Sequence, residues 1–165
     1  MNRIMVDHKK CTGCRICELV CSTRMVLDGF NPKAAALKVA EVGLLQADVP
    51  VVCMHCFGQN GQGKAPCSAA CPTDAFVTDS TTGALRLIRE KCIGCGACVR
   101  DCPFGVLSLH PETNTPSKCD LCDGQPLCVA HCPTGALSFK SETLGGWLKR
   151  EEWVQKVVSK GGEKN

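Results

Sequence analysis

The apolar residues of this chain fall into short runs separated by turn-forming residues, and each run has the length of a short β-strand. Residues 75–78 and 84–88 flank the segment 79–83, which reads DSTTG and is typical of a turn. We therefore expect these two runs to form a hairpin. Residues 4–6 and 136–139 are also strand candidates, although they lie far apart along the chain.

Two further strands are expected before residue 53. Residues 36–42 alternate well enough between apolar and polar positions to form a strand, and residues 49–52 form a short extended apolar run. Pro32 and Gly43 bracket the first of these runs with residues that favour turns.

A helical pattern is found near the end of the sequence. Between residues 144 and 160 we expect a short amphipathic helix that packs on this protein or on a partner subunit, because one helical face would carry Trp147, Leu148, Val154 and Val158. Its charges are mixed in sign, which disfavours a helix lying on a membrane. No apolar stretch reaches the roughly 18 residues of a membrane span, and the first residues lack the apolar core of a secretory signal. We expect a cytoplasmic protein.

Cysteine dominates the composition. The 165 residues include 16 Cys, whereas aromatic residues make up 4%. So few large side chains predict a thin core, and metal bound by cysteine is an alternative source of stability.

The cysteines form four runs of four. The first and third runs have the spacing C-x2-C-x2-C-x3-C of bacterial ferredoxins, in which three thiolates hold one cubane and the fourth completes the cubane of a partner run. The sequence therefore predicts four [4Fe–4S] clusters. Zinc sites also use C-x2-C pairs, so a zinc-binding interaction module is the alternative, but zinc does not need the further x3-C ligand. The runs are Cys11, Cys14, Cys17, Cys21; Cys53, Cys56, Cys67, Cys71; Cys92, Cys95, Cys98, Cys102; and Cys119, Cys122, Cys128, Cys132.

The order of runs and strands indicates which runs share clusters. The second and third runs flank the expected hairpin, as in a complete two-cluster ferredoxin, and pairing of the strands near the two ends would close a second one around it. We favour this nested arrangement over sequential pairing of first with second and third with fourth. The predicted fold is α+β, with an outer module of residues 1–48 and 104–143, an inner module of residues 49–103, and a C-terminal helix and tail of residues 144–165.

Nesting predicts the ligand sets. Cluster one takes Cys11, Cys14, Cys17 and Cys132; cluster two takes Cys119, Cys122, Cys128 and Cys21; cluster three takes Cys53, Cys56, Cys67 and Cys102; and cluster four takes Cys92, Cys95, Cys98 and Cys71. Because sixteen thiolates suffice for four clusters, we interpret the histidines as non-ligands, namely His8, His55, His110 and His131. Of these, His55 and His131 are close enough to ligands in sequence to tune cluster potentials.

Two other features suggest functions that we set aside. The segment 58–65, GQNGQGKA, nearly matches a phosphate-binding loop, but Ala65 replaces the required hydroxyl residue. We expect a surface loop there, and a candidate docking site. The formal net charge of +3 would become about −5 with about −2 for each loaded cluster. Basic residues also form no long run, so we do not expect nucleic-acid binding.

These motifs resemble the four-cluster ferredoxin-like subunits of molybdenum and tungsten oxidoreductases. The resemblance covers roughly residues 3–140 and is carried by DHKKCTGCRIC at 7–17, VPVVCMHC at 49–56 and SKCDLC at 117–122. Among these subunits, the short chain and FNPK at 30–33 are most similar to the iron–sulfur subunit of a tungsten-dependent aldehyde oxidoreductase. The family pairs its runs in the nested way. This chain departs from it at Ser22, where a Pro is usual after the run, and in its glycine-rich spacer.

The resemblance implies a non-catalytic subunit. It would relay single electrons between a large tungsten- or molybdenum-cofactor catalytic subunit and a flavin- or NAD-binding subunit or a ferredoxin. No catalytic set of side chains is evident in the sequence. The alternatives are a free-standing soluble polyferredoxin and a relay subunit of a formate dehydrogenase, hydrogenase or CO dehydrogenase. Head-to-tail contacts between copies would give an extended assembly.

Overall fold

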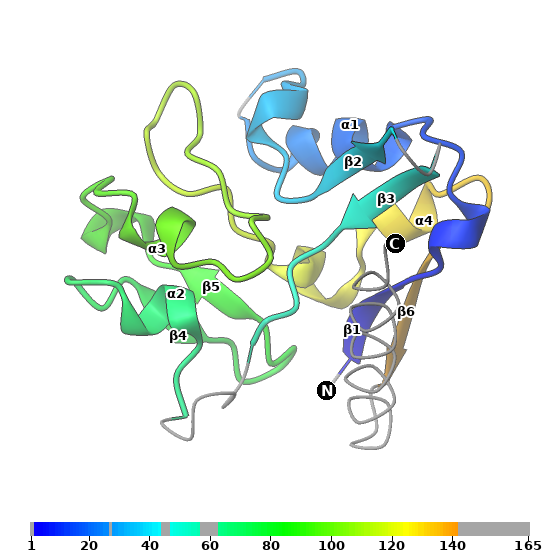
Figure 1. Ribbon diagram of the computed structural model, residues 1–165. Coiled ribbons are helices and arrows are strands. Elements are labelled where there is room, and N and C mark those ends of the chain that lie inside the picture. The colour runs from blue at the N-terminus through cyan, green and yellow to red at the C-terminus, as the bar shows by residue number, and fades with distance from the viewer. Residues whose placement is uncertain (1, 27, 44–46, 57–62, 142–165) are drawn as a thin grey trace, which may run out of the picture.

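The computed structural model describes residues 2–26, 28–43, 47–56 and 63–141. These residues form three two-stranded antiparallel sheets and several short helices, which is a small α+β fold (Figure 1). The helix expected between residues 144 and 160 lies outside the described residues, as does most of the glycine-rich segment. Within the described ranges, no helix is long and apolar enough to cross a membrane.

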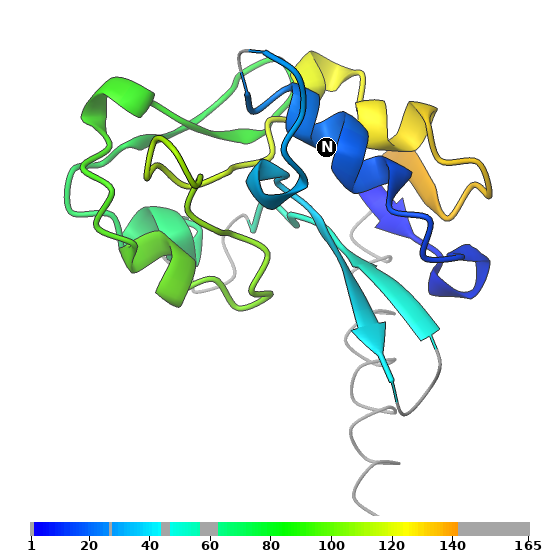
Figure 2. The same ribbon diagram turned by 90° about the horizontal axis from the view of Figure 1, so that it is seen from above.

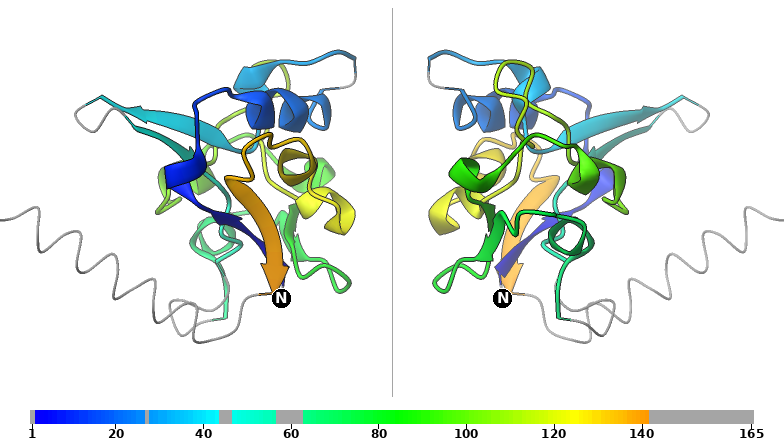
Figure 3. Two further views of the ribbon diagram at one scale, coloured as in Figure 1. Left: turned by 90° about the vertical axis from the view of Figure 1, so that its right-hand side faces the viewer. Right: turned by 90° about the vertical axis from the view of Figure 1, so that its left-hand side faces the viewer.

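The first sheet joins segments from opposite ends of the described chain. Strand β1 (Asn2–Val6) pairs antiparallel with β6 (Leu137–Ser141), and Ile4 lies opposite Phe139. The two strands run side by side in both views of Figure 3. The side chains of Ile4 and Leu137 are buried, so one face of this sheet closes the core. The expected pairing of these distant strands is confirmed.

The other two sheets are hairpins; the one at 75–88 was expected from the sequence, whereas for residues 36–42 and 49–52 the strands were expected but not their pairing. Strand β2 (Lys38–Val42) pairs with β3 (Ala47–Val51), and β4 (Phe76–Thr78) pairs with β5 (Leu85–Leu87). The turn between β4 and β5 is held by Asp79, whose carboxylate accepts hydrogen bonds from the backbone N–H groups of Thr81 and Thr82 at 3.0 and 2.8 Å.

Each cysteine run carries one short α-helix. These are α1 (Ile16–Thr23), α2 (Pro66–Ala69), α3 (Ala97–Arg100) and α4 (Leu127–Ala130). The helix of the first run packs against that of the fourth, α1 on α4, and the helix of the second run packs against that of the third, α2 on α3. Figure 2 shows the same pairs of helices side by side. Short 3-10 turns complete the fold at His8–Lys10, Pro32–Ala34, Arg89–Lys91 and Leu121–Gly124, and the last of these is η4.

The replacement of Pro by Ser22 has a structural consequence. A residue that precedes Pro is disfavoured in the helical region, and the helices of the other three runs end before the Cys-Pro pairs at 71–72, 102–103 and 132–133. Helix α1 continues past Cys21 to Thr23. Ser22 is fully buried, donates to the carbonyl of Leu19 at 2.7 Å and accepts from the N–H of Asn31 at 3.1 Å.

The core is built from small residues and thiols. Among the described residues, the buried apolar side chains are Ala, Val, Leu, Ile and Cys, without an aromatic ring. Leu121 and the pair Ala35 and Ala84 are completely buried. This agrees with the thin core predicted from the composition.

Candidate metal centres

Four cavities in the described part of the chain are lined by thiols, which come from two runs in three of the cavities and from three runs in the remaining one. They enclose about 310 to 380 Å³ of empty space each, so they belong to one size class. All sixteen cysteines are free thiols. We number the cavities by their cysteines: cavity one has Cys11, Cys14, Cys17 and Cys132; cavity two has Cys21, Cys119, Cys122, Cys128 and also Cys53; cavity three has Cys53, Cys56, Cys67 and Cys102; and cavity four has Cys71, Cys92, Cys95 and Cys98.

The thiols surround a space rather than a point. Among the described residues, no three Cys, His, Asp or Glu side chains converge closely enough to hold a single metal ion. A zinc ion needs four donors within about 2.3 Å of one centre, whereas a cubane binds each thiolate at a separate iron corner. The donor type and its spacing around each cavity therefore fit a [4Fe–4S] cluster.

Left-handed backbone conformations curl the ligand loops around the cavities. In the third run Gly94 has a φ of 68°, and a Cβ added there would lie 2.8 Å from the backbone oxygen of Asn114. In the fourth run the same curl uses residues other than glycine as well, because Leu121, Cys122 and Asp123 have positive φ in addition to Gly124. Positive φ at such residues costs on the order of 1–3 kcal/mol each. Sequence reasoning did not predict these strained conformations.

Burial raises the proton affinity of several ligand thiols. It raises the pKa of Cys17 and Cys21 to about 11, and that of Cys67 and Cys128 to about 12. The pKa of Cys119 is raised well above its usual value for the same reason. Metal ligation requires thiolates, so iron binding must displace these protons.

The last cysteine of two runs behaves differently. Burial opposes ionisation of Cys71 and Cys132, but the hydrogen bonds that each sulfur accepts from backbone N–H groups and a threonine hydroxyl together outweigh it and lower the pKa of both thiols. The N–H of Ala75 lies 3.3 Å from the Cys71 sulfur. The N–H of Ala36 donates in the same way to Cys21 at 3.3 Å. Such donors stabilise negative charge on sulfur and are among the features that set cluster potentials.

Lys118 is a buried cation between two of the cavities. Its side chain is inside the protein, with 6% of the residue exposed. The ammonium lies 3.1 Å from the Cys53 sulfur, 3.4 Å from His55 Nδ1 and 3.3 Å from the Cys119 carbonyl. Burial alone would lower the pKa of Lys118, but the Cys53 and Cys119 sulfurs outweigh it and raise the pKa. The sequence analysis missed this residue, although it directly precedes a ligand.

Among the four histidines, only His55 lines one of these cavities, and it lines cavity three. The imidazole is 2% exposed, and burial lowers the pKa of His55 to about 2. His110 is also buried, but its Nδ1 accepts hydrogen bonds from the backbone N–H groups of Glu112 and Thr113 in a turn. His131 is exposed beside the carbonyl of Leu127, so the interpretation that it tunes a cluster gains no support.

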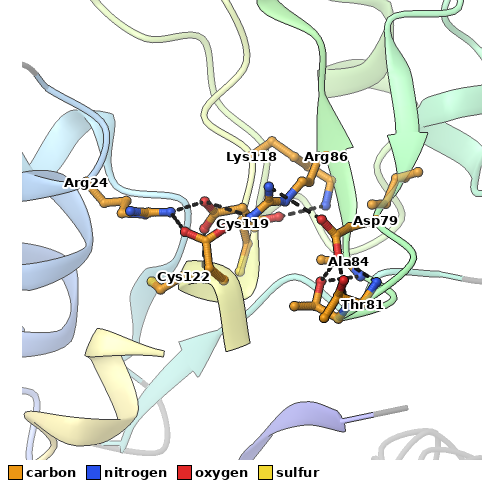
Figure 4. Close-up of polar contacts among 12 residues, drawn as sticks. Arg24, Asp79, Thr81, Ala84, Arg86, Lys118, Cys119 and Cys122 are labelled. Atoms are coloured by element: carbon orange, nitrogen blue, oxygen red, sulfur yellow. Dashed lines mark hydrogen bonds and ion pairs between the residues drawn. The ribbon is translucent and has the colours of Figure 1, made fainter. Parts of the chain in front are cut away.

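An ion-pair network surrounds the segment that carries Cys119 and Cys122. Arg24, at the end of α1, pairs with Asp120 at 3.0 Å and with Asp123 in η4. Arg86, in β5, pairs with Asp123 and with Asp79, the latter at 3.5 Å. Figure 4 shows the two arginines approaching the segment that carries Cys119 and Cys122 from opposite sides. The network thus links helix α1 to the β4–β5 hairpin.

The cavities also differ in their exposure. Cys14 of cavity one and Cys95 of cavity four are exposed, whereas no cysteine of cavities two and three is exposed. Helix α1 carries Cys17 of cavity one and Cys21 of cavity two, about one helical turn or 6 Å apart along its axis. Cys53 lines both cavity two and cavity three. Cavity one is therefore close to cavity two, and cavity two to cavity three.

More than half of this chain matches a known protein family. Residues 46–142 match the family described as "4Fe-4S dicluster domain". The chain is 39% identical over 124 residues to the "Aliphatic sulfonate oxidoreductase, polyferredoxin-like subunit" of Pyrococcus furiosus, covering 74% of this chain and 66% of that protein. It is 34% identical over 121 residues to the "Thiosulfate reductase electron transfer subunit PhsB" of Salmonella typhi, covering 70% of this chain and 59% of that one. The chain thus spans less than two thirds of the length of these two relatives.

A shorter relative and a solved structure extend the comparison. The "Electron transport protein HydN" of Escherichia coli is 31% identical over 143 residues, covering 74% of this chain and 77% of the relative. A chain in the structure titled "Active site complex BamBC of Benzoyl Coenzyme A reductase in complex with Zinc" has 27% identity and a TM-score of 0.51, covering 99% of this chain and 93% of its own.

Proposed function

The chain belongs to the 4Fe–4S dicluster family, and from that premise we propose that it holds four [4Fe–4S] clusters and relays single electrons within a larger oxidoreductase. The observation that carries the proposal is the set of four cavities, of which three are lined by four cysteines and cavity two by five, because Cys53 lines it as well as cavity three. Each cluster, when bound, accepts one electron and passes it on.

The proposed ligand sets are the nested ones, and each set lines one cavity; Cys53 lines cavity two as well, but we assign it to cluster three. Support comes from Cys132, which lines cavity one with Cys11, and from Cys71, which lines cavity four with Cys92. The packing of α1 on α4 and of α2 on α3 favours the same pairing. We propose an outer module of residues 1–48 and 104–143 around an inner module of residues 49–103.

The protein's own contribution is to position the sites and to control their charge. Helix α1 and Cys53 keep neighbouring sites close, which favours rapid transfer between them. Backbone N–H groups at Cys21 and Cys71 stabilise charge on sulfur. We propose that electrons enter and leave beside Cys14 and Cys95, which are exposed.

The proposed setting is a cytoplasmic complex in which this chain is a non-catalytic subunit. Support comes from the relatives named as electron-transfer or polyferredoxin-like subunits. The resemblance of the cysteine motifs points further, to a tungsten- or molybdenum-cofactor catalytic subunit, such as an aldehyde-oxidising one, and to a flavin- or NAD-binding subunit or a ferredoxin as the second partner. Head-to-tail assembly through the two exposed sites is a secondary proposal that electron microscopy of the native complex would test.

The first test is the iron and acid-labile sulfide content after anaerobic purification. We expect about sixteen of each per chain, as four cubanes require. Co-purification of a large tungsten or molybdenum protein would support the proposed complex, whereas a loaded monomer without partners would favour a free-standing polyferredoxin. Colourless protein that contains zinc and almost no iron would contradict the electron-relay function.

The second test examines the ligand sets by electron paramagnetic resonance of reduced Cys→Ser variants. Nesting predicts that Cys11→Ser and Cys132→Ser perturb the same signal, and that Cys71→Ser and Cys92→Ser perturb another. Sequential pairing instead predicts that Cys11→Ser and Cys71→Ser share a signal. A spectrum in which Cys132→Ser perturbs a signal different from that of Cys11→Ser would refute nesting.

A further inference from the structure

Lys118 occupies the junction between the outer and inner cysteine sets. Its ammonium lies 3.1 Å from the sulfur of Cys53, which lines cavities two and three, and 3.3 Å from the backbone carbonyl of Cys119. Lys118 itself lines cavity three and not cavity two. The residue is almost entirely buried, so water screens this charge far less than it would at the surface. Its charge therefore acts more strongly on cavity three than on cavity two.

His55 adds a second polar group to cavity three. Its Nδ1 accepts a hydrogen bond from the N–H of Leu85 at 3.0 Å and also faces the Lys118 ammonium. Two donors at Nδ1 place the imidazole proton on Nε2. That Nε2 is buried and has no partner within the described protein, while the residue lines cavity three. A buried N–H without a partner is costly, and sulfur in the cavity would satisfy it.

We propose that Lys118 and His55 are positioning residues that give cluster three the highest electron affinity of the four sites. This inference rests on the proposed relay function. When one electron reaches the site from its neighbour, the site gains one negative charge, and it loses that charge when the electron moves on. No bond forms and no proton moves. Lys118 and the Nε2–H group of His55 favour the more negative state.

None of the other three cavities is lined by a lysine or a histidine of the described residues, and Arg15, which lines cavity one, is an exposed cation already paired with Glu18 and Glu41. Cluster three would therefore be the site at which the electron has its lowest energy, and this site lies in the interior of the relay, away from the two exposed ends. An electron would be held there until the acceptor beyond the chain is ready. The pair would thus set the position at which the partly reduced relay stores its electron.

The test is a redox titration followed by electron paramagnetic resonance, with iron counted in parallel. In Lys118→Met we expect a full iron content, a lowered midpoint for cluster three, a smaller decrease for cluster two, and unchanged midpoints for clusters one and four. The signal of cluster three is identified by its perturbation in Cys56→Ser. Lys64→Met is the matched control, because this lysine is exposed and its ammonium pairs with Asp74 at 3.2 Å.

Two further variants keep the inference testable if Lys118→Met loses iron. Lys118→Gln retains hydrogen-bond donors without the charge, and we expect it to lower the same midpoint. In His55→Phe we expect a lowered cluster-three midpoint, and loss of the shift in Fe–S stretching frequency on transfer of the wild type to D2O. Unchanged midpoints in Lys118→Gln protein that has its full iron content would overturn this inference but not the proposed function. Wild-type protein without iron would overturn the proposed function and the inference with it.

Discussion

At the residue scale, Gly94 shows how tightly a ligand loop is packed. Its φ of 68° would cost another residue about 1–2 kcal/mol, and an added Cβ would lie 2.8 Å from the backbone oxygen of Asn114. A backbone atom cannot swing aside as a long side chain can. We therefore expect Gly94→Ala to displace Cys92 and Cys95 and to lose cluster four. The iron content should fall by about four per chain.

Gly105 supplies the control for this prediction. It has a φ of 60°, but a Cβ there would meet no atom within 4 Å. Gly105→Ala should therefore keep all its iron. It should be destabilised only by the conformational penalty of about 1–2 kcal/mol, measured as a small decrease in thermal midpoint. Equal iron loss in both variants would mean that the positive φ, rather than the contact with Asn114, makes alanine unacceptable at Gly94.

At the scale of elements, Glu18 connects α1 to β2 through a hydrogen bond. This buried side chain accepts a hydrogen bond from the N–H of Val39 at 2.5 Å. In Glu18→Ala the buried N–H would lose its acceptor, at a cost of about 1–3 kcal/mol. We expect a clear decrease in thermal midpoint, followed by the loss of visible absorbance as the clusters are released.

A neighbouring glutamate provides the comparison. Glu41 shares the partner Arg15 with Glu18, but its side chain is 75% exposed. An exposed ion pair contributes about 0–1 kcal/mol, so Glu41→Ala should be close to wild type. If the two variants lost the same stability, the Arg15 ion pairs rather than the hydrogen bond to Val39 would hold the helix.

At the scale of the whole molecule, the network of Arg24, Arg86 and Asp123 joins α1 to the β4–β5 hairpin. These side chains are 30 to 58% exposed, so we expect Asp123→Asn to lower stability by about 1 kcal/mol or less per pair. The loss should appear at low salt and nearly vanish in about 1 M salt, where the screening length is about 3 Å. Thermal midpoints at the two salt concentrations measure it.

The exposed pair of Lys64 and Asp74 serves as the reference for that experiment, since Asp74→Asn removes one ion pair outside the junction. We expect Asp74→Asn to match wild type at both salt concentrations. A loss in Asp123→Asn that persisted at high salt would instead indicate that the strained η4 turn, and not the charge pairs, depends on Asp123.

The sequence determined the short-range structure. A C-x2-C unit limits the separation of its two thiols through a few backbone angles, and alternating apolar residues bounded by turn residues predict strands. The hairpin at 75–88, the strands at 36–52 and the pairing of 4–6 with 136–139 were therefore accessible without coordinates. The Cys-Pro pairs likewise predict where three helices end, and Ser22 accounts for the longer α1.

The tertiary structure alone decided the contacts between residues far apart in sequence. Lys118 meets Cys53 across 65 positions, and Arg24 meets Asp123 across 99. Neither contact has a local signature, because each depends on how the closed hairpins and helix pairs pack. The positive φ angles of Leu121 and Cys122 were also decided by the tertiary structure, since neither residue favours that conformation and the surrounding fold must impose it. Cysteine spacing determined the chemistry of the sites, and packing decided which charges face them.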